Sequence, residues 1–380
     1  MSELNYLEKL LDGVEVEWRN LGDTSLFEIA NNGRKPVKAS LRIAGETPYY
    51  GANNIQDYVD GYTHDGEYVL IAEDGSASLE NYSIQYATGK FWANNHVHVV
   101  RGKERVHSRF LYHYLCIVNF LPFLTGGGRA KLTKGQLIEI PVPIPCPENP
   151  EKSLAIQLEI VRVLDKFTAL TAELTAELTA ELTARKKQYN YYRDQLLSFD
   201  EGEVEWRTLG EITRKIASGR NKTRQAEGDF PVYGSTGLLG FTNEPAYSGD
   251  LLLVARVGAY AGLVNAVSGH FDVSDNTLII HPSDSWNARF AFHQLTHMNL
   301  NQYAVGAGQP LITGGMLKNL KVPVPSLNEQ TRIAKILDKF ETITVSITEG
   351  LPREIELRQK QYEYYRDLLF SFPKPDSVTN

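Results

Sequence analysis

Residues 171–182 read TAELTAELTAEL, a four-residue unit repeated without interruption, and this tract decides the fold. It lies within residues 151–199, which contain neither glycine nor proline. Alanine, glutamate and leucine are strong helix formers. The sequence therefore predicts one helix of about 75 Å, at a rise of about 1.5 Å per residue. Each unit adds about 6 Å and turns the leucine stripe by about 40°, so the copy number sets a length and a rotation, as in a spacer.

The rest of the chain is a tandem duplication with a period of domain size. The sequence VEWR followed by LG occurs at residues 16–22 and again at 204–210. Further matched blocks follow in the same order in both halves, namely PxYG at 48–51 and 231–234, FxxHxL at 110–115 and 290–295, the segments 128–145 and 308–325, LDKF at 164–167 and 337–340, and KQYxYYRD at 187–194 and 360–367. Chance does not produce such a series, so two similar domains are expected.

Composition limits the class of protein. A chain of 380 residues suggests two or three domains, and a hydrophobic content of 42% is ordinary for soluble proteins. No apolar run reaches the roughly 20 residues that cross a bilayer, and the N-terminal sequence MSELNYLEKL does not resemble a signal peptide. Cys116 and Cys146 are the only cysteines, which favours a cytoplasmic location over a disulfide framework or a structural zinc site. The net charge of −7 does not exclude a local basic surface.

Basic residues gather in stretches that also hold asparagine and glycine, at residues 214–224, at the matching place 34–42, and after the triple glycine 126–128. Such stretches suit phosphate contacts and base-edge readout, whereas a single cluster is more often a solvated loop. The recurrence of the cluster in both halves favours nucleic-acid binding. The candidate DNA-binding residues are Arg34, Lys35, Lys38, Arg42, Asn53, Asn54, Arg129, Lys131, Arg214, Lys215, Arg220, Asn221, Lys222, Arg224, Ser235 and Gln309.

Short apolar runs separated by turn residues predict strands, and longer amphipathic runs predict helices. Strands are expected at 68–71, 97–100, 251–254 and 276–280, and helices at 108–120 and 288–298. The proline-rich segment 141–147 is expected to be an extended connector to the long helix. Asn328 is expected to cap the second long helix, which Gly350 and Pro352 should interrupt.

The two long helical regions match in length, because the interval from Phe167 to Lys187 equals that from Phe340 to Lys360. Equal spacers suit two helices packed antiparallel about a pseudo-twofold axis. Residues 1–13 resemble the end of a long helix, so the two chain termini are expected to lie close together.

These features together resemble the specificity subunit of type I restriction–modification enzymes. The resemblance rests on a variable domain that ends in I/V-P-x-P, on the helix start EQxxIxxIL at residues 329–337, and on the repetition of this plan. It covers essentially the whole chain. The TAEL array is similar to that of the members of this family whose central helix carries such repeats.

The resemblance implies an α+β fold with two similar target recognition domains of mixed and antiparallel strands, joined by two long antiparallel helices that form a coiled-coil-like, pseudo-twofold symmetric spacer. The expected parts are an N-terminal helix segment that packs with the C-terminal region (1–13), the first recognition domain (14–147), the central helix (148–200), the second recognition domain (201–326), and the C-terminal helix and tail (327–380).

The resemblance also implies a function. Each domain reads one half of a bipartite, asymmetric sequence in double-stranded DNA, and the helices set the unread gap. The implied partners are two methyltransferase subunits and restriction subunits, without a membrane. No cofactor is expected in this chain, because S-adenosylmethionine, ATP and Mg belong to the partner subunits.

The residues themselves argue against a catalytic chain. An amino-group DNA methyltransferase needs an N/D-P-P-Y/F loop and a glycine-rich cofactor turn, and neither is found here, nor is a P-loop. Acidic pairs such as Asp272 and Asp275 are more often solvated than catalytic. His96 and His98 lack a third metal ligand nearby in sequence, and the duplicated His113 and His293 are expected to pack or hydrogen-bond.

The alternative interpretation is a coiled-coil scaffold that does not bind specific DNA sequences. Tyrosine is enriched at protein interfaces, and the ends of both long helices are rich in it. The candidate partner-binding residues are Tyr189, Tyr191, Tyr192, Tyr362, Tyr364 and Tyr365. For any one of them, packing between the two helices is an equally good explanation. A gel-shift assay on bipartite DNA separates the two functions.

Overall fold

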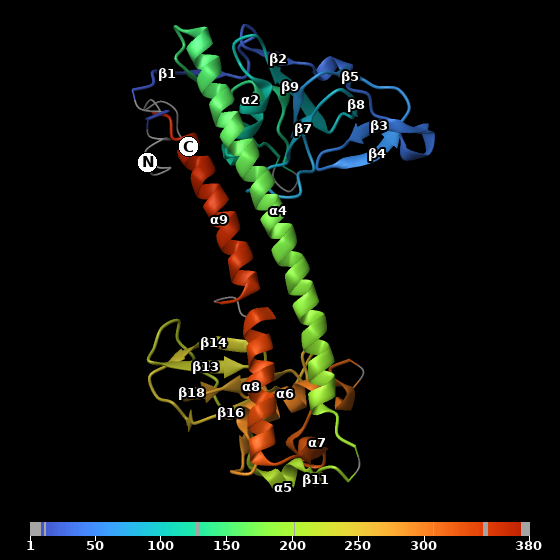
Figure 1. The fold of residues 1–380 in the computed structure, drawn as a ribbon, viewed down its shortest axis with the longest axis vertical. Helices are drawn as coiled ribbons and strands as arrows, with labels where there is room; N and C mark the ends of the chain where they lie inside the picture. Colours follow the sequence, from blue (N-terminus) through green and yellow to red (C-terminus); the bar gives the residue numbers. More distant parts are fainter. Residues whose placement is uncertain are drawn as a thin grey trace. The chain divides into compact units, whose positions relative to one another are not determined.

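The structure is a computed structural model that describes residues 9–10, 13–126, 130–200, 202–306, 308–344 and 349–373. The chain divides into two compact units, one made of residues 1–175 and 357–380 and the other of residues 176–356. Each unit contains one strand-rich domain and segments of the long helices (Figure 1). The domains are called domain 1 (residues 16–145) and domain 2 (residues 205–324).

Domain 1 contains two four-stranded sheets and a two-stranded ribbon. The first sheet has the order β2-β9-β6-β7 and is antiparallel, whereas the second has the order β4-β3-β8-β5 with a parallel β3–β8 pair. The ribbon pairs β1 with β10, which is the segment expected to be an extended connector. The strands are β1 (Val16–Asn20), β2 (Phe27–Ile29), β3 (Ala44–Tyr50), β4 (Ile55–Val59), β5 (His64–Asp65), β6 (Tyr68–Ala72), β7 (Ile84–Ala87), β8 (Lys90–Ala93), β9 (Val97–Gly102) and β10 (Pro141–Pro145).

The central strand β6 explains the layers of domain 1, because all five of its residues are buried. Side chains alternate across a strand. Val69 and Ile71 therefore join the core beneath helix α2 (Ser108–Leu115), whereas Tyr68 and Leu70 join a second core with Phe91 of β8. The first sheet thus lies between α2 and the second sheet. The remaining short helices are η1 (Asn31–Gly33), η2 (Ala39–Leu41), η3 (Leu121–Phe123) and α3 (Lys134–Leu137).

Domain 2 repeats this topology strand for strand, with sheets β12-β19-β16-β17 and β14-β13-β18-β15 and the ribbon β11–β20. Its parallel pair is again the equivalent one, β13–β18. The strands are β11 (Glu205–Thr208), β12 (Thr213–Ser218), β13 (Phe230–Gly234), β14 (Gly237–Thr242), β15 (Tyr247–Ser248), β16 (Leu251–Ala255), β17 (Val264–Val267), β18 (His270–Val273), β19 (Thr277–Pro282) and β20 (Lys321–Val324), and the helices are α5 (Leu209–Ile212), α6 (Ala288–His297), η4 (Leu300–Tyr303) and α7 (Gly314–Lys318). The predicted duplication and the α+β class are confirmed.

The TAEL tract is helical, as predicted, and lies inside the uninterrupted helix α4 (Pro150–Leu197), drawn in green in Figure 1. Its 48 residues correspond to about 72 Å of helix. The start of α4 is well defined, because the Asn149 side chain accepts a hydrogen bond from Lys152 N at 3.0 Å and Pro150 occupies the first helical position.

The second long helix consists of α8 (Leu327–Thr344) and α9 (Leu351–Leu369), so the predicted interruption is confirmed. Gly350 has a φ of 80°, and a Cβ atom there would lie 2.5 Å from Thr342 O, which only glycine avoids. Two expectations were wrong. Helix α2 ends at Leu115 instead of 120, and α8 is capped by Ser326, whose Oγ accepts from Glu329 N at 3.3 Å. Asn328 lies inside the first turn, because Leu327 already begins the helix.

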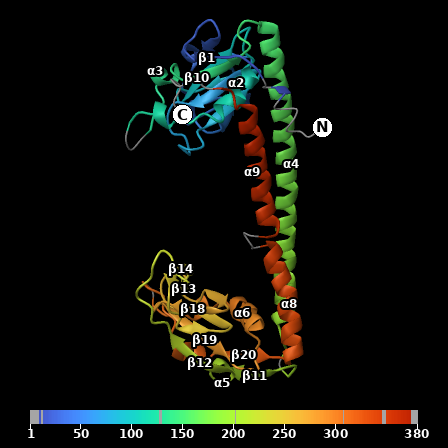
Figure 2. The ribbon, with the colours of Figure 1, turned by 90° about the vertical axis from the view of Figure 1, so that its left-hand side faces the viewer.

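Within the first unit, α9 runs antiparallel to the early part of α4, which Figure 2 also shows. The Phe167 and Tyr365 rings lie 5.5 Å apart, and Thr168 Oγ1 lies 3.1 Å from the Tyr362 hydroxyl. Within the second unit, the Tyr192 ring stacks on Phe340 of α8 at 5.7 Å. Among the described helices, none combines the length and the apolar character needed to cross a membrane.

Each long helical region ends by docking onto a domain. The two regions end in related sequences, RDQLLSF at 193–199 and RDLLFSF at 366–372. Leu197 of the first packs in the core of domain 2, and Phe370 of the second packs in the core of domain 1. Trp18 Nε1 also donates a hydrogen bond to Pro373 O at 2.9 Å. Residues 1–8, 11–12 and 374–380 lie outside the described residues, and so does the predicted proximity of the two termini.

Candidate nucleic-acid interface

At one end of domain 1, loops distant in sequence meet to form what is called loop cluster 1 (residues 31–35, 51–54, 73–77, 125–126 and 130–131). Arg34 Nη1 lies 2.6 Å from Glu73 Oε2, and Lys131 Nζ lies 3.0 Å from Glu73 Oε1. The Asn53 amide donates to Gly75 O and accepts from Ala77 N, both at 2.8 Å. The structure therefore brings the candidates Arg34, Asn53 and Lys131 together.

Glu73 neutralises much of the positive charge that the sequence suggested here. Burial raises the pKa of the Glu73 carboxyl, but hydrogen bonds from Arg34 and Lys131 outweigh burial and hold the pKa below its usual value. Arg34 further donates to Val97 O at 2.9 Å and to Asn31 O at 3.1 Å. Arg34 thus mainly links the segments around residues 31, 73 and 97 by hydrogen bonds. Asn54 is exposed beside it, and Arg129 lies outside the described residues.

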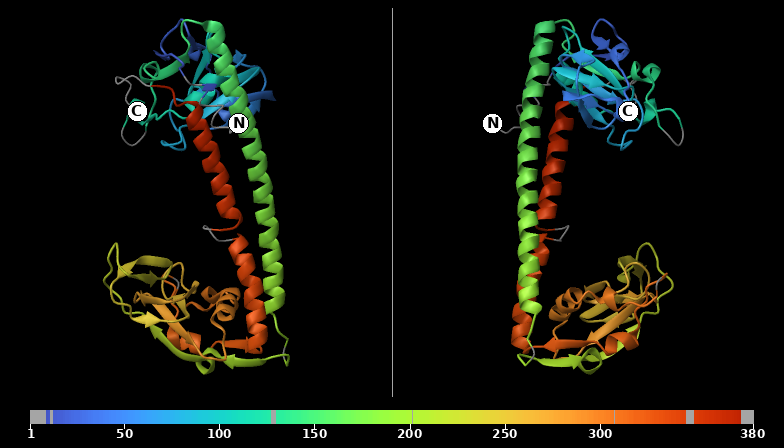
Figure 3. Two further views of the ribbon diagram at one scale, coloured as in Figure 1. Left: turned by 60° about the vertical axis from the view of Figure 1, so that its left-hand side comes forward. Right: turned by 90° about the vertical axis from the view of Figure 1, so that its right-hand side faces the viewer.

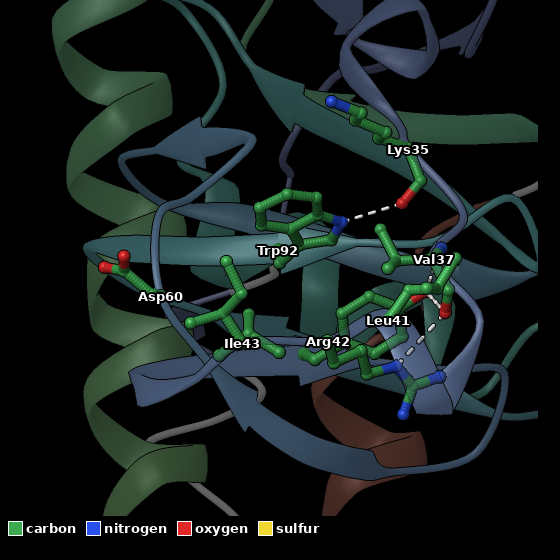
Figure 4. A pocket seen from close by; sticks show the side chains of 9 residues that line it. Lys35, Val37, Leu41, Arg42, Ile43, Asp60 and Trp92 are labelled. Carbon is green, nitrogen blue, oxygen red and sulfur yellow. Dashed lines mark hydrogen bonds between the residues drawn. The ribbon is translucent and has the colours of Figure 1, made fainter.

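A cavity of about 290 Å³ lies beside this cluster (Figure 4). Its wall includes the Trp92 ring, whose Nε1 donates to Lys35 O at 2.7 Å, and Arg42, which stacks 4.0 Å over the Tyr49 ring. Leu41 and Ile43, at its edge, are 70% and 71% exposed. Lys35 and Lys38 are exposed as well, whereas Arg42 also bonds Asp57 at 3.3 Å. The cavity therefore combines an apolar rim with cations.

Domain 2 has an equivalent loop cluster 2 (residues 219–222, 235, 256–258, 274–276 and 309–312). The backbone N–H groups of Arg220 and Asn221 both donate to Val273 O, at 3.0 and 2.9 Å. Ser235 Oγ donates to Asn276 O at 2.8 Å, and Arg256 N donates to the same oxygen at 3.0 Å. Ile312 N in turn donates to Arg256 O, and the neighbouring Gln309 is exposed. The structure thus brings the candidates Arg220, Asn221, Ser235 and Gln309 together, whereas Arg214 and Lys215 lie on strand β12.

The cations of domain 2 differ from those of domain 1 in having few acidic partners. Arg214 pairs with Asp284. For the exposed Lys215, Arg220, Lys222 and Arg224, the described part of the chain places no carboxylate within ion-pair distance. Asn221 donates to Asp272 at 2.6 Å, and its buried Oδ1 has no hydrogen-bond partner among the described residues. The four exposed cations are available for an anionic ligand such as DNA phosphate, whereas Asn221 Oδ1, as an acceptor, requires a hydrogen-bond donor.

In each cluster, one position was not among the residues that the sequence assigned to the interface. Glu73 directly follows β6 and Arg256 directly follows β16, and these two strands are equivalent and fully buried. One domain therefore places an acid where the other places a guanidinium. The available signal was the position directly after a buried central strand, because a residue at that position is held rigidly at the edge of the sheet.

The histidines have structural roles. His113 Nε2 and His293 Nε2 each lie 2.7 Å from an aspartate oxygen, of Asp165 and Asp338 respectively, which confirms the expected packing or hydrogen bonding. His96 bonds Asp74 at 2.5 Å. His293, Asp338 and Glu341 have the spacing of metal ligands, but Arg289 already bridges both carboxylates, at 2.7 and 2.6 Å.

The structure separates the candidate tyrosines into two groups. The rings of Tyr189, Tyr192 and Tyr365 pack on Phe340 or Phe167, and Tyr362 bonds Thr168. The equivalent residues Tyr191 and Tyr364 are 62% and 55% exposed. Helix packing therefore accounts for the first group, and Tyr191 and Tyr364 are left available for another chain.

Comparison with known proteins identifies the family. The model of the type I restriction modification DNA specificity domain matches residues 14–184 and 201–357. A putative type I restriction enzyme specificity subunit from Haemophilus influenzae is 48% identical over 97% of this chain and 98% of its own. A type I restriction enzyme specificity subunit from Escherichia coli is 38% identical over the full length of both chains. The crystal structure of a type I restriction–modification S subunit from M. genitalium has the same fold, with a TM-score of 0.55 at 18% identity over 96% of this chain and 98% of that one.

A duplicated α+β domain on long helices is thus the fold of this protein, and the family model identifies the fold as that of a DNA specificity subunit. The chain belongs to the specificity subunits of type I restriction–modification systems. Its role is DNA sequence recognition, and it is not the catalytic subunit.

Proposed function

We propose that domain 1 reads one half of a bipartite target in double-stranded DNA and that domain 2 reads the other half. The observation that carries this proposal is the strand-for-strand repetition of one topology with chemically different loop clusters. Cluster 1 has paired cations around Glu73, whereas cluster 2 has Arg256 at the equivalent position and exposed cations beside it. Different side chains on one scaffold favour different bases, so the two half-sites differ and the target is asymmetric.

The long helices set the unread gap, and the TAEL array makes this chain a member of the repeat-carrying subset of the family. Paired readers related by a pseudo-dyad engage half-sites about one helical turn, or roughly 34 Å, apart on one face of DNA. The uninterrupted helix α4 supports a rigid spacer. One TAEL unit of about 6 Å spans more than the rise of one base pair, about 3.4 Å, so copy number changes the gap by about one or two base pairs.

The proposed partners are two methyltransferase subunits, which dock on the two equivalent helix ends, and restriction subunits, which join that complex. The exposed Tyr191 and Tyr364 support two docking sites of the same kind. S-adenosylmethionine, ATP and Mg belong to these partner subunits. The complex acts in the cytoplasm, where two free cysteines in a chain of this length are ordinary.

Exchange of residues 14–145 for the corresponding domain of another family member tests the proposal. The chimera and the parent chain are each expressed with the methyltransferase subunits, and long-read sequencing reports the methylated motif. One half-site is expected to change while the other half-site and the gap persist. A change in both half-sites would refute separate reading. A scaffold without sequence recognition would give no sequence-dependent gel shift on bipartite DNA, even with methyltransferase subunits present.

A further inference from the structure

Each domain is attached to its long helix by the same pair of polar contacts. In domain 1, Asp165 Oδ1 of α4 accepts from Arg109 Nε at 2.9 Å and from His113 Nε2 at 2.7 Å. In domain 2, Asp338 Oδ1 of α8 accepts from Arg289 at 2.7 Å and from His293 Nε2 at 2.7 Å. The donors in each domain are four positions apart on one helix face, of α2 or α6. Figure 3 shows α6 beside α8 in the second unit.

Eight residues before each aspartate, a glutamine of α4 or α8 makes a further set of polar contacts to the same domain. The Gln157 side chain accepts from His107 N at 2.8 Å and donates to Arg105 O at 3.1 Å. Its equivalent Gln330 accepts from Asn287 N at 2.8 Å and donates to Ser285 O at 3.0 Å. Both amides are fully buried. Each glutamine therefore holds the loop that leads into α2 or α6.

In each unit, the glutamine and the aspartate together form a two-point attachment between the helix and the domain. The glutamine and the aspartate are separated by the same number of positions in both helices (165 − 157 = 338 − 330 = 8), or by about 12 Å along the axis. Between them, Leu164 and Leu337 are buried in the domain cores. Apolar packing alone tolerates small rotations, whereas charge-assisted hydrogen bonds at a separate point fix an angle.

The aspartates are ionised in this arrangement. Burial raises the pKa of the Asp165 and Asp338 carboxyls, but the hydrogen bonds from the arginine and the histidine outweigh burial and hold both values below the usual range. His113 and His293 are buried, with side chains 3% and 0% exposed. In each unit, the aspartate carboxylate thus accepts from a buried histidine and from an arginine one helical turn away. Two donors from one helix face fix the orientation of the carboxylate relative to the domain.

We propose that Asp165 and Asp338, with their arginine and histidine partners, are positioning residues that set the angle of each recognition domain on its helix and so restrict the gap that the subunit accepts. This inference rests on the proposed bipartite reading. A recognition domain of this size is roughly 30 Å across, so a rotation of about 7° at the attachment moves the distant loops by about 3.5 Å, or roughly one base pair. The aspartates therefore govern gap length and leave base readout to the loop clusters.

The test uses the complete chain in complex with its methyltransferase subunits and a plasmid library in which the two half-sites are separated by every gap within a few base pairs of the preferred one. Methylation sequencing reports the rate at each gap. We expect Asp165→Ala and Asp338→Ala to lower the preference for the native gap over its neighbours by about tenfold, a difference of about 1.4 kcal/mol, with both half-site sequences unchanged. Asp165→Asn and Asp338→Asn, which keep an oxygen acceptor but lose the charge, are expected to lower the preference by less than the alanine variants do.

Glu329→Gln is the matched control. Glu329 pairs with Arg332 at 2.6 Å on the exposed face of α8, so its loss removes a helix ion pair without touching a domain. The control should keep the native gap preference. If the alanine variants do not assemble, Arg109→Lys and Arg289→Lys replace them, because lysine keeps the charge but loses the fork of donors.

The outcomes separate the two proposals. A broadened gap in the aspartate or arginine variants, with the control unchanged, supports the positioning role. An equal loss of methylation at every gap would mean that the contacts only stabilise the fold, and unchanged rates would mean that they do nothing measurable; either result overturns the inference. If the unmodified complex methylates no bipartite site at all, it is the proposed function that fails.

Discussion

His98 Nδ1 lies 2.9 Å from the side-chain amide nitrogen of Asn31, deep in domain 1. The Asn31 carbonyl oxygen accepts from Val99 N at 2.9 Å, which fixes the amide orientation, and His98 Nε2 lies 2.7 Å from Leu132 O. The imidazole must therefore be neutral, with its proton on Nε2. The uncharged ring of His98, a residue of β9, thus links the first residue of η1 to the loop that carries Lys131.

This pair predicts a pH dependence of stability. Burial lowers the pKa of His98, although the Leu132 carbonyl and Glu73 oppose that effect. Below pH about 6.5, the unfolded chain binds the proton and the folded domain does not, so the free energy of unfolding falls as the pH drops from there toward the folded-state pKa. His98→Gln should lower stability at pH 7.5 by about 1–3 kcal/mol and flatten the decline between pH 7.5 and 5.5. Urea unfolding followed by tryptophan fluorescence measures both effects, and an equally steep decline in the variant would contradict the assignment.

Arg220 and Lys222 are expected to contact phosphates, because both are exposed and free of acidic partners in the described part of the chain. The double change Arg220→Ala with Lys222→Ala should weaken DNA binding and reduce the slope of log K against log salt by about 2. The control is Arg185→Ala with Arg332→Ala, which removes the same charge from helix residues paired with Glu181 and Glu329. Fluorescence titrations at several salt concentrations give the slopes, and identical slopes for both variants would exclude these two residues from the contacts.

Deletion of residues 175–178, one TAEL unit, should shorten the preferred gap by about one or two base pairs, because the helix loses about 6 Å. Insertion of one further unit should lengthen it by the same amount. The half-sites should persist in both variants, since neither loop cluster is altered. Long-read methylation sequencing reads the gap and the half-sites together. A motif that is identical in all three proteins would show that α4 is not a ruler.

Tyr191 and Tyr364 are expected to bind the methyltransferase subunits, because they are the two most exposed of the six candidate tyrosines. Tyr191→Ser and Tyr364→Ser should each weaken assembly by about 2 kcal/mol, or roughly 30-fold, and leave the unfolding free energy within about 0.5 kcal/mol of the original. Tyr192→Ser is the comparison, since its ring stacks on Phe340 and its loss should lower stability instead. Sedimentation of the reconstituted complex and thermal melts give the two quantities. Reduced stability in the Tyr191 and Tyr364 variants would assign them to packing.

Arg256 is expected to contribute to only one half-site. Its backbone is fixed in loop cluster 2 by hydrogen bonds to Asn276 and Ile312. Arg256→Ala should cost about 1–3 kcal/mol in discrimination at a base of the second half-site, with the first unaffected. Binding to a set of single-base variants of the target measures the effect. A loss spread evenly over both half-sites would argue for a structural role.

The sequence by itself determined the large-scale plan. The TAEL tract and the absence of glycine and proline around it specify α4 through local propensity, and Gly350 and Pro352 specify the interruption between α8 and α9. The matched blocks specify two copies of one domain. These features could be predicted because helix formation and strand patterning depend on residues close together in the chain.

Only the tertiary structure decided what the candidate residues do. Glu73 lies far from Arg34 and Lys131 in sequence, yet it binds both and removes much of their charge. Arg256 lies in loop cluster 2 because it directly follows the buried strand β16, which ends at that cluster. His113 meets Asp165 because α2 folds onto α4. Contacts of this kind depend on which surfaces pack together over long sequence separations, and composition, spacing and periodicity carry no information about that choice.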